Sequence, residues 1–326
     1  MNPLQRAINA TRFFSGFLPS FSALGHRARA ITWAPLEPDF RGQRWLVTGA
    51  STGLGREIAR RAAVAGAEVL AVARSGDRLA SLAEDVRGGA GTISAFTADL
   101  ALVSEVDRLA DHLTRAQAPL DVLVNNVGVL LARPETTAEG LDLAFATNLL
   151  GPWHLTERLR GERGLSPGGA VITMSSGGLY NVRLSLRALE NQAHYQGALA
   201  YAAHKRAQLA VNHQWRADAR GIDYYVMHPG WADTPGVATS LPAFHRLLGP
   251  LLRTAAEGCD TALWLAATRP RQRTDPGLWF DRALRSEHLL LGTRGGADEG
   301  ALLAYLAEAL ERARGSAQRC AAAATH

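Results

Sequence analysis

Tyr201 and Lys205, four positions apart in the segment Tyr-Ala-Ala-His-Lys, carry the most specific chemical signal in the sequence. Lys205 is the single lysine among 35 lysines and arginines in 326 residues. Residues four apart share one face of a helix, so both side chains can point into one pocket. A compact ammonium beside the tyrosine hydroxyl lowers its pKa from about 10 toward neutral. The pair predicts a tyrosine general acid–base, although a surface Tyr–Lys pair gives the same pattern.

A glycine-rich segment, Thr48-Gly49-Ala50-Ser51-Thr52-Gly53-Leu54-Gly55, separates a predicted strand from a predicted helix. Three glycines there permit a tight turn and close backbone approach, and the helix N-terminus offers N–H groups to a pyrophosphate. We therefore expect a dinucleotide. The second strand is followed by Arg74 instead of an acid, and a guanidinium suits a 2′-phosphate, so NADP is favoured over NAD. Arg56 is a second candidate for that phosphate.

The elements that position these residues alternate along the chain. We expect strands at 45–47, 68–72, 92–96, 120–124, 170–174, 223–227 and 278–280, and helices at 54–65, 77–86, 103–113, 141–159, 201–219 and 255–267. This alternation predicts an α/β fold with a doubly wound parallel sheet (Rossmann) and a ligand crevice at the carboxyl ends of the strands. We expect an N-terminal arm (1–40), one domain (41–285), and a C-terminal helix with a flexible tail from Arg314 (286–326).

Together these motifs resemble the short-chain dehydrogenase/reductase family over about residues 42–285. The resemblance also includes Asp99-Leu100, Asn125-Asn126-Val127-Gly128, Asn148, Ser175-Ser176 and Pro229-Gly230. The segments 175–178, 201–209, 228–237 and 279–282 are similar to one subgroup. Val127 replaces the family's usual alanine. The 25 positions from Ser176 to Tyr201 indicate an inserted loop, which leaves the exact placement of the serine open.

The resemblance implies a role for each matching residue. Tyr201 would be the acid–base, Ser176 would bond the substrate oxygen, Asn148 would hold a water that relays protons, and Lys205 would bond the nicotinamide ribose. The implied cofactor-binding residues are Thr48, Gly49, Ser51, Thr52, Gly53, Leu54, Gly55, Arg74, Asp99, Leu100, Asn126, Val127, Gly128, Tyr201, Lys205, Pro229, Gly230, Ala232 and Thr234. His204 is expected on the helix surface.

The first 36 residues contain no Asp or Glu but carry four arginines and four phenylalanines, Phe13, Phe14, Phe17 and Phe21. They fit a basic amphipathic helix on a membrane surface or an arm packed on the body, and a transit peptide fits less well. No apolar stretch is long enough to span a bilayer. Cys259 and Cys320 lie far apart, which favours a reducing compartment and a cytoplasmic location, with peripheral membrane contact open. We expect no metal site, and a homo-oligomer is left open.

The net charge of +5 is spread among acids without a nucleic-acid-binding motif, so we expect no nucleic-acid partner. The apolar residues at 237, 241, 244, 247 and 248 follow the predicted nicotinamide loop and suggest either core or a lid over a lipophilic substrate. We expect an NADP(H)-dependent oxidoreductase acting on a small apolar carbonyl or alcohol. The alternatives are a catalytically quiet NADP-binding scaffold or sensor at a membrane, and an epimerase or dehydratase, whose glycine spacing differs.

Overall fold

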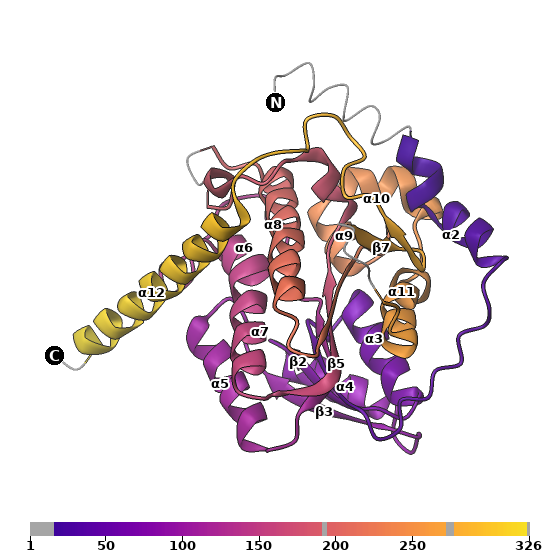
Figure 1. The fold of residues 1–326 in the computed structure, drawn as a ribbon, viewed down its shortest axis with the longest axis horizontal. Coiled ribbons are helices and arrows are strands. Elements are labelled where there is room, and N and C mark those ends of the chain that lie inside the picture. Colours follow the sequence, from indigo (N-terminus) through magenta and orange to yellow (C-terminus); the bar gives the residue numbers. More distant parts are fainter. Residues whose placement is uncertain (1–15, 191–193, 272–276, 325–326) are drawn as a thin grey trace.

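The computed structural model describes residues 16–190, 194–271 and 277–324, and these form one sheet with strand order β3-β2-β1-β4-β5-β6-β7-β8 (Figure 1). The parallel strands are β1 (Arg44–Thr48), β2 (Glu68–Ala73), β3 (Thr92–Thr97), β4 (Leu120–Asn125), β5 (Leu165–Met174), β6 (Asp223–Met227) and β7 (Leu278–Phe280). The order reverses between β1 and β4, which is the doubly wound arrangement. The predicted fold class is confirmed.

One short strand, β8 (Ala283–Arg285), was not predicted and pairs antiparallel with β7. The two residues between them, Asp281 and Arg282, both have positive φ, 50° and 54°. A two-residue turn of that conformation matches the twist of a tight hairpin. The hairpin places Asp281 directly at the carboxyl end of β7, where it becomes important below.

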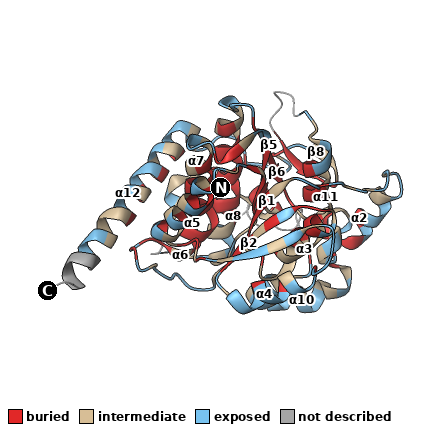
Figure 2. Ribbon diagram, turned by 90° about the horizontal axis from the view of Figure 1, so that it is seen from below, coloured by how far each residue is buried: buried red, intermediate tan, exposed pale blue. Residues whose placement is uncertain are grey.

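Side chains alternate between the two faces of the sheet because successive residues of a strand point in opposite directions. Leu46, Leu123 and Val171 lie in one buried cluster, and their neighbours Val47, Val124 and Ile172 lie in the other. Figure 2 shows these buried strands between two helical layers. The first cluster is covered by α5 (Val103–Arg115), α7 (Gly151–Gly161), α8 (Gly197–Ala217) and α12 (Glu299–Ala324), and the second by α3 (Gly53–Val64), α4 (Gly76–Glu84) and α11 (Ala255–Thr268).

The helix predicted at 141–159 is not continuous. The structure has a short α6 (Leu143–Phe145), a π-helical turn (Ala146–Leu150) and then α7. A π-turn inserts one residue into the helical repeat and often occurs at functional sites. Asn148 lies in the middle of this turn.

The flexible tail expected from Arg314 also differs from the structure, in which α12 continues to Ala324. Its alanine-rich end has the highest helix propensity of any composition, which accounts for the continuation. Shorter helices lie at η2 (Gly177–Asn181), η3 (Leu186–Ala188), α9 (Pro235–Ser240), α10 (Pro242–Leu248) and η4 (Gly249–Leu251). Among the described helices, α12 included, none combines the length and apolar character needed to cross a membrane.

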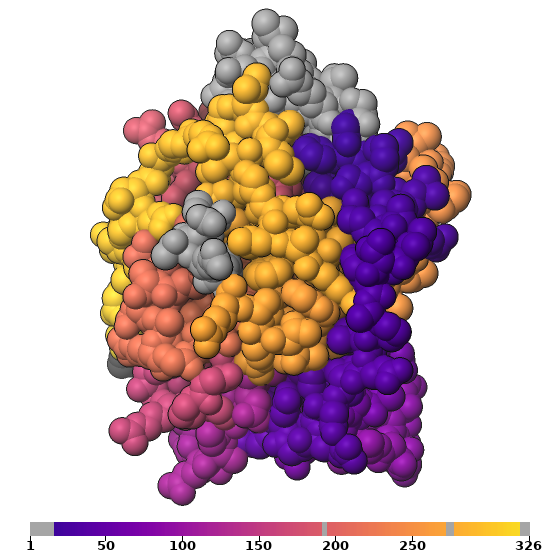
Figure 3. Space-filling model, turned by 45° about the vertical axis from the view of Figure 1, so that its right-hand side comes forward, coloured from indigo at the N-terminus to yellow at the C-terminus, as the bar shows by residue number. Residues whose placement is uncertain are grey.

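The described part of the N-terminal arm packs on the body of the protein. Residues 16–21 are helical and are followed by α2 (Ala23–Ala30). Figure 3 shows the indigo arm lying along the orange segment that contains α11 and β7. Phe21 is only 2% exposed. For this part of the arm the structure therefore favours packing on the body over a free membrane-binding face, while Phe13 and Phe14 lie outside the described residues.

Candidate active site

The three glycines of the loop after β1 are each required by a different contact. Gly49 has φ +67°, and a Cβ there would lie 2.9 Å from the Cα of Val127. Gly53 has φ +55° and faces Thr234, while a Cβ on Gly55 would lie 2.4 Å from both the Asn126 amide nitrogen and the Gly49 carbonyl. A side chain at any of these positions would press against the neighbouring residues. With glycines there the backbone of the loop stays uncovered, which allows close approach by a ligand.

Thr52 begins α3 without a hydrogen bond from its own side chain to the first turn, so this helix end is not capped by that hydroxyl. The loop is fixed to the neighbouring strand by Asn126, whose amide donates to the Thr48 carbonyl at 2.9 Å. The Thr48 hydroxyl in turn accepts from the backbone N–H of Asn126 and of Val127 at 3.0 and 3.1 Å. An uncapped helix N-terminus beside side-chain-free backbone fits a pyrophosphate.

Arg74 lies directly after β2, and its side chain is 67% exposed with one nitrogen 4.0 Å from the Asp99 carboxylate. This loosely paired guanidinium fits a 2′-phosphate at the end of β2. Arg56 is engaged elsewhere, because it bonds the Asp85 carboxylate at 2.5 Å and the Arg78 carbonyl at 3.2 Å. The structure thus leaves Arg74 as the better placed of the two candidates.

The remaining cofactor candidates lie at the carboxyl ends of β3, β4 and β6. The Leu100 carbonyl lies against Gly151, Gly128 faces the Asn148 oxygen and the Lys205 ammonium, and Thr234 begins α9 with its hydroxyl accepting from Val237. Pro229 and Gly230 instead contact Arg253, since a Cβ on Gly230 would lie 2.4 Å from its Nε. Ala232 forms a β-bridge with the same arginine.

The two adjacent serines after β5 point to different partners. The buried Ser175 donates to the Lys205 carbonyl at 3.1 Å, which fastens the strand end to α8. Ser176 is half-buried, accepts from the backbone N–H of Gly178 at 3.2 Å, and interacts with the Tyr201 hydroxyl. Ser176, and not Ser175, therefore shares a site with the tyrosine, in line with the prediction made from the order of the pair.

Lys205 is 2% exposed, and its ammonium donates to the Met174 carbonyl at 2.7 Å and lies 5.4 Å from the centre of the Tyr201 ring. Burial lowers the pKa of Lys205 to about 7. Burial raises the pKa of Tyr201 to about 12, against an opposing effect of Ser176. The predicted lowering of the tyrosine pKa by the lysine is therefore wrong for this structure, because desolvation of the phenolate dominates.

Asn148 is fully buried and its side chain is clamped to the loop after β4. Its oxygen accepts from the Val129 N–H at 2.7 Å and its nitrogen donates to the Val129 carbonyl at 2.8 Å. Its backbone carbonyl accepts from Gln208 at 2.6 Å, and the residue four positions later, Pro152, has no N–H to donate to it. The water-relay role implied by the resemblance stays a prediction.

The prediction that His204 lies on the helix surface is wrong. Its ring is fully buried, with Nδ1 3.2 Å from the Asn148 amide nitrogen and Nε2 2.8 Å from the Leu189 carbonyl. Every residue of α8 from Ala202 to Asn212 is buried, so the residue next to Lys205 faces protein and not solvent. Sequence reasoning missed this support, as it missed Gln208; the one available signal was the position of His204 next to Lys205 on the predicted helix.

The apolar run after the nicotinamide loop forms α9 and α10, and none of the residues in these two helices is buried. Phe244 packs edge-on against Trp231, and the Ser240 hydroxyl donates to the Leu130 carbonyl at 2.8 Å. The two helices therefore lie over the carboxyl edge and not inside the core. Of the two alternatives, core or a lid over the substrate, this arrangement favours the lid.

Comparison with known proteins agrees with this geometry. The family model described as short chain dehydrogenase matches residues 43–243. A relative named dehydrogenase/reductase SDR family member 12, from Bos taurus, is 32% identical over 308 residues, 92% of this chain and 97% of its own. Polyprenol dehydrogenase from Danio rerio is 30% identical over 248 residues, 71% of this chain and 75% of its own.

Among solved structures, a short chain dehydrogenase from Burkholderia cenocepacia in complex with NADP is 25% identical with a TM-score of 0.57. The match covers 70% of this chain and 91% of that one. The similarity to family member 12 agrees with the subgroup indicated by residues 228–237 and 279–282. These comparisons support an NADP-dependent oxidoreductase, and they do not support a catalytically quiet scaffold.

Proposed function

Because this chain belongs to the short-chain dehydrogenase/reductase family, we propose that it is an NADPH-dependent reductase of an apolar carbonyl compound, with Tyr201 as the general acid. The observation that carries the proposal is the convergence of Ser176, Tyr201 and Lys205 at the carboxyl end of β5, beside a glycine loop that a dinucleotide fits. The ends of β2 and β4, the two strands that pair with β1, carry further expected cofactor-binding residues.

The cofactor would supply a hydride, and the protein must handle one proton at the oxygen that becomes an alcohol. A tyrosine with a pKa of about 12 is protonated at neutral pH, so Tyr201 is ready to donate its proton. Ser176, which interacts with the Tyr201 hydroxyl, would hold the same substrate oxygen.

The side-chain nitrogen of Lys205, which donates to the Met174 carbonyl, would reach the nicotinamide ribose. Arg74 would receive the 2′-phosphate. Trp231, Phe244 and the half-exposed faces of α9 and α10 offer an apolar wall for the substrate. The similarity to a polyprenol dehydrogenase, named for an apolar alcohol, supports the same substrate class.

Purified protein should be incubated with NADPH and aldehydes and ketones of increasing apolar length, together with polar carbonyls of matched size. We expect NADPH consumption that rises with apolar length and is weaker with NADH. Binding of NADPH without consumption by any carbonyl would contradict the proposed activity. Faster consumption with the polar set would contradict the apolar substrate class.

A further inference from the structure

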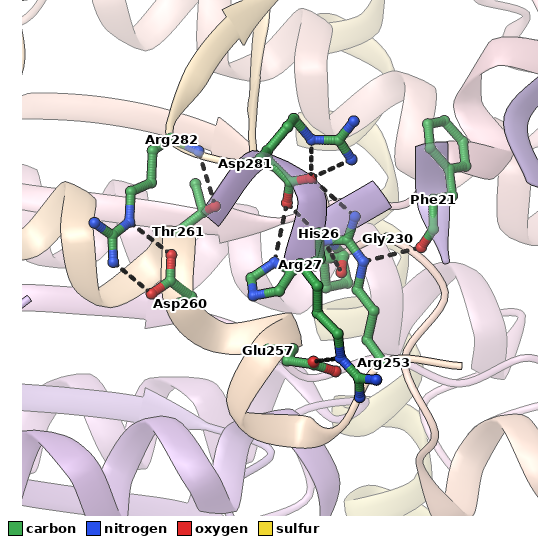
Figure 4. Close-up of polar contacts among 12 residues, drawn as sticks. Phe21, His26, Arg27, Gly230, Arg253, Glu257, Asp260, Thr261, Asp281 and Arg282 are labelled. Atoms are coloured by element: carbon green, nitrogen blue, oxygen red, sulfur yellow. Dashed lines mark hydrogen bonds and ion pairs between the residues drawn. The ribbon is translucent and has the colours of Figure 1, made fainter. Parts of the chain in front are cut away.

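Arg253 is buried at the carboxyl edge, and its guanidinium holds the N-terminal arm (Figure 4). Its Nε donates to the Phe21 carbonyl at 2.9 Å, and its Nη2 to the Ser20 carbonyl at 3.1 Å. The remaining N–H groups reach the Pro229 carbonyl at 3.2 Å and both oxygens of Asp281 at 2.6 and 2.9 Å. One side chain thus joins the arm, the loop after β6 and the turn after β7.

Asp281 completes the attachment from the other side. Its side chain is 1% exposed, and it also accepts from Arg29 of α2 at 2.7 Å. Burial would raise the pKa of Asp281, but His26, Arg253 and Arg29 hold it below its usual range. The carboxylate is therefore ionised and fully paired, so buried charge-assisted bonds hold the arm, together with the exposed ion pair between Arg27 and Glu257.

Phe21 is the arm residue that this attachment brings to the candidate active site. Its carbonyl accepts from the Trp231 N–H at 2.9 Å, at the start of the loop that leads to Thr234. Its ring lies so close to Gly177, the residue after Ser176, that a Cβ there would be 2.7 Å from the ring edge. Phe21 therefore touches both segments that would flank the reacting oxygen.

The ring of Phe21 also belongs to a small aromatic cluster that is separate from the two large cores of the sheet. It packs edge-on against His228, Trp231 and Phe280, at 4.7, 5.9 and 5.2 Å between ring centres, and stacks with Tyr180 at 6.3 Å. The cluster consists mainly of residues from the carboxyl edge and its loops. Its loss should affect those loops more than the sheet.

We propose that the N-terminal arm is an integral part of the active site, in which Phe21 is a positioning residue that sets the distance between the Ser176 segment and the 229–234 loop. This inference rests on the proposed function for its catalytic readout. It goes beyond that function because residues 16–22 precede the conserved sheet and match no catalytic motif. The arm would act through Ser176 and Trp231 and would not itself touch the substrate.

The test uses variants of the full chain: one that introduces a steric clash, one that relieves it, and two controls. Gly177→Ala places a methyl group against the Phe21 ring, and we expect kcat for the best carbonyl of the panel to fall about tenfold. Combining it with Phe21→Leu, which removes the ring edge, should restore much of that loss. Gly161→Ala is the control, because no neighbouring atom would lie within 4 Å of its Cβ, and we expect unchanged kcat.

Phe21→Ala should lower kcat about tenfold or more. The Kd for NADPH should rise by a smaller factor, because Phe21 supports the 229–234 loop at the expected nicotinamide end of the cofactor site, whereas the glycines of the loop after β1 lie against Asn126, Val127 and Thr234. Phe40→Ala is its control: Phe40 is equally buried but packs on Trp45 in the core below α3. Both variants should lower the melting temperature, and only Phe21→Ala should lower kcat among folded molecules. Equal kcat for the two variants, or for Gly177→Ala and Gly161→Ala, would overturn the proposal.

A second readout does not depend on substrate turnover. Hydrogen–deuterium exchange of Phe21→Ala should rise in residues 176–182 and 229–236 and stay unchanged in the glycine loop at 49–55. If the wild-type protein reduces no carbonyl but the exchange changes as expected, the proposed function fails and the arm coupling stands. If exchange in both loops is unchanged, the arm proposal fails whatever the activity.

Discussion

The side-chain nitrogen of Asn148 lies 3.2 Å from Nδ1 of His204, and this contact defines the state of both residues. Burial lowers the pKa of His204 to about 4, so the ring is neutral at physiological pH. Because Asn148 donates to Nδ1, the proton of the ring is on Nε2, which donates to the Leu189 carbonyl. His204 thus links the π-turn to the loop that precedes Tyr201.

Substitutions of His204 can measure the contributions of its two hydrogen bonds separately. His204→Leu removes the partner of the Leu189 carbonyl and of one N–H of the Asn148 amide, so we expect a loss of about 2–6 kcal/mol in the free energy of unfolding, at roughly 1–3 for each group. His204→Asn keeps an acceptor near Nδ1 and His204→Gln keeps a donor near Nε2, and each should recover part of the loss. Denaturant unfolding measures all three, and equal stability of His204→Leu and wild type would show that the link contributes nothing.

Gly55→Ala tests the cofactor cradle. A Cβ at this position would lie 2.4 Å from the Asn126 side chain and from the Gly49 carbonyl, both of which shape the loop. We expect at least about a tenfold weaker Kd for NADPH, equivalent to roughly 1.4 kcal/mol. Gly161→Ala is the control, because no atom lies within 4 Å of its Cβ and we expect unchanged binding by fluorescence titration. Unchanged binding by Gly55→Ala would place the cofactor elsewhere.

Arg74→Ala should weaken NADPH much more than NADH, because only NADPH carries the 2′-phosphate that the exposed guanidinium would meet. Arg56→Ala serves as the control, since Arg56 is bonded to Asp85 and Arg78 of α4. We expect Arg56→Ala to weaken both cofactors little. Equal losses of NADPH and NADH affinity in Arg74→Ala would remove Arg74 from the phosphate site.

A pH-dependent contribution to stability is expected from His213 on α8. Burial would lower the pKa of His213, but hydrogen bonds to Glu287 and Glu299 raise it to about 9. The ring contacts Glu299 at 2.8 Å and Glu287 at 3.2 Å, which joins α8 to the start of α12. A raised pKa means that the contribution is fully present below the unfolded value of about 6.5 and is lost as pH rises through about 9.

We therefore expect His213→Gln to melt at a lower temperature than wild type at pH 6, with the difference shrinking toward pH 9.5. Thermal unfolding across this range measures it. A difference that stays constant or grows with rising pH would contradict a charged His213 between the two glutamates.

The sheet could be predicted almost completely from the sequence because buried strands and the helices between them have strong periodic patterns. The strands predicted at 223–227 and 278–280 agree with β6 and β7 to the residue. The break near Asn148 had a partial signal in Pro152, which lies inside the helix predicted at 141–159, but the clamp of Asn148 to Val129 could not be predicted. Likewise, the sequence of the arm is equally compatible with phenylalanines that face lipid and with phenylalanines that face protein.

In the candidate site, too, some features could be predicted from the sequence and others could not. Spacing and residue type were enough to bring together Ser176, Tyr201 and Lys205, because Ser176 follows the end of β5 and the other two lie one turn apart on α8, the helix between β5 and β6. The pKa of Tyr201 was predicted in the wrong direction, because burial cannot be read from a four-residue spacing. The attachment of the arm depends on Arg253 and Asp281, which lie more than 230 residues from Ser20 and Phe21. Arg253 belongs to no motif, and the motif that contains Asp281 does not indicate which segment it pairs with.

The central claim is that the Tyr201 hydroxyl transfers the proton, with the compact amine of Lys205 one helical turn away. Lys205→Arg is a supporting variant: Lys205 is buried between Gly128 and the Met174 carbonyl, so we expect the broader guanidinium to displace its neighbours and most activity to be lost.

The most direct test is the turnover number of Tyr201→Phe with NADPH and the best carbonyl substrate of the wild-type protein, together with the Kd for NADPH. Removing one hydroxyl leaves the ring in place, so we expect the Kd to stay within about threefold and kcat to fall by at least about 10²-fold, the lower range of general acid–base help. A Tyr201→Phe variant that binds NADPH normally and turns over at the wild-type rate would contradict the account.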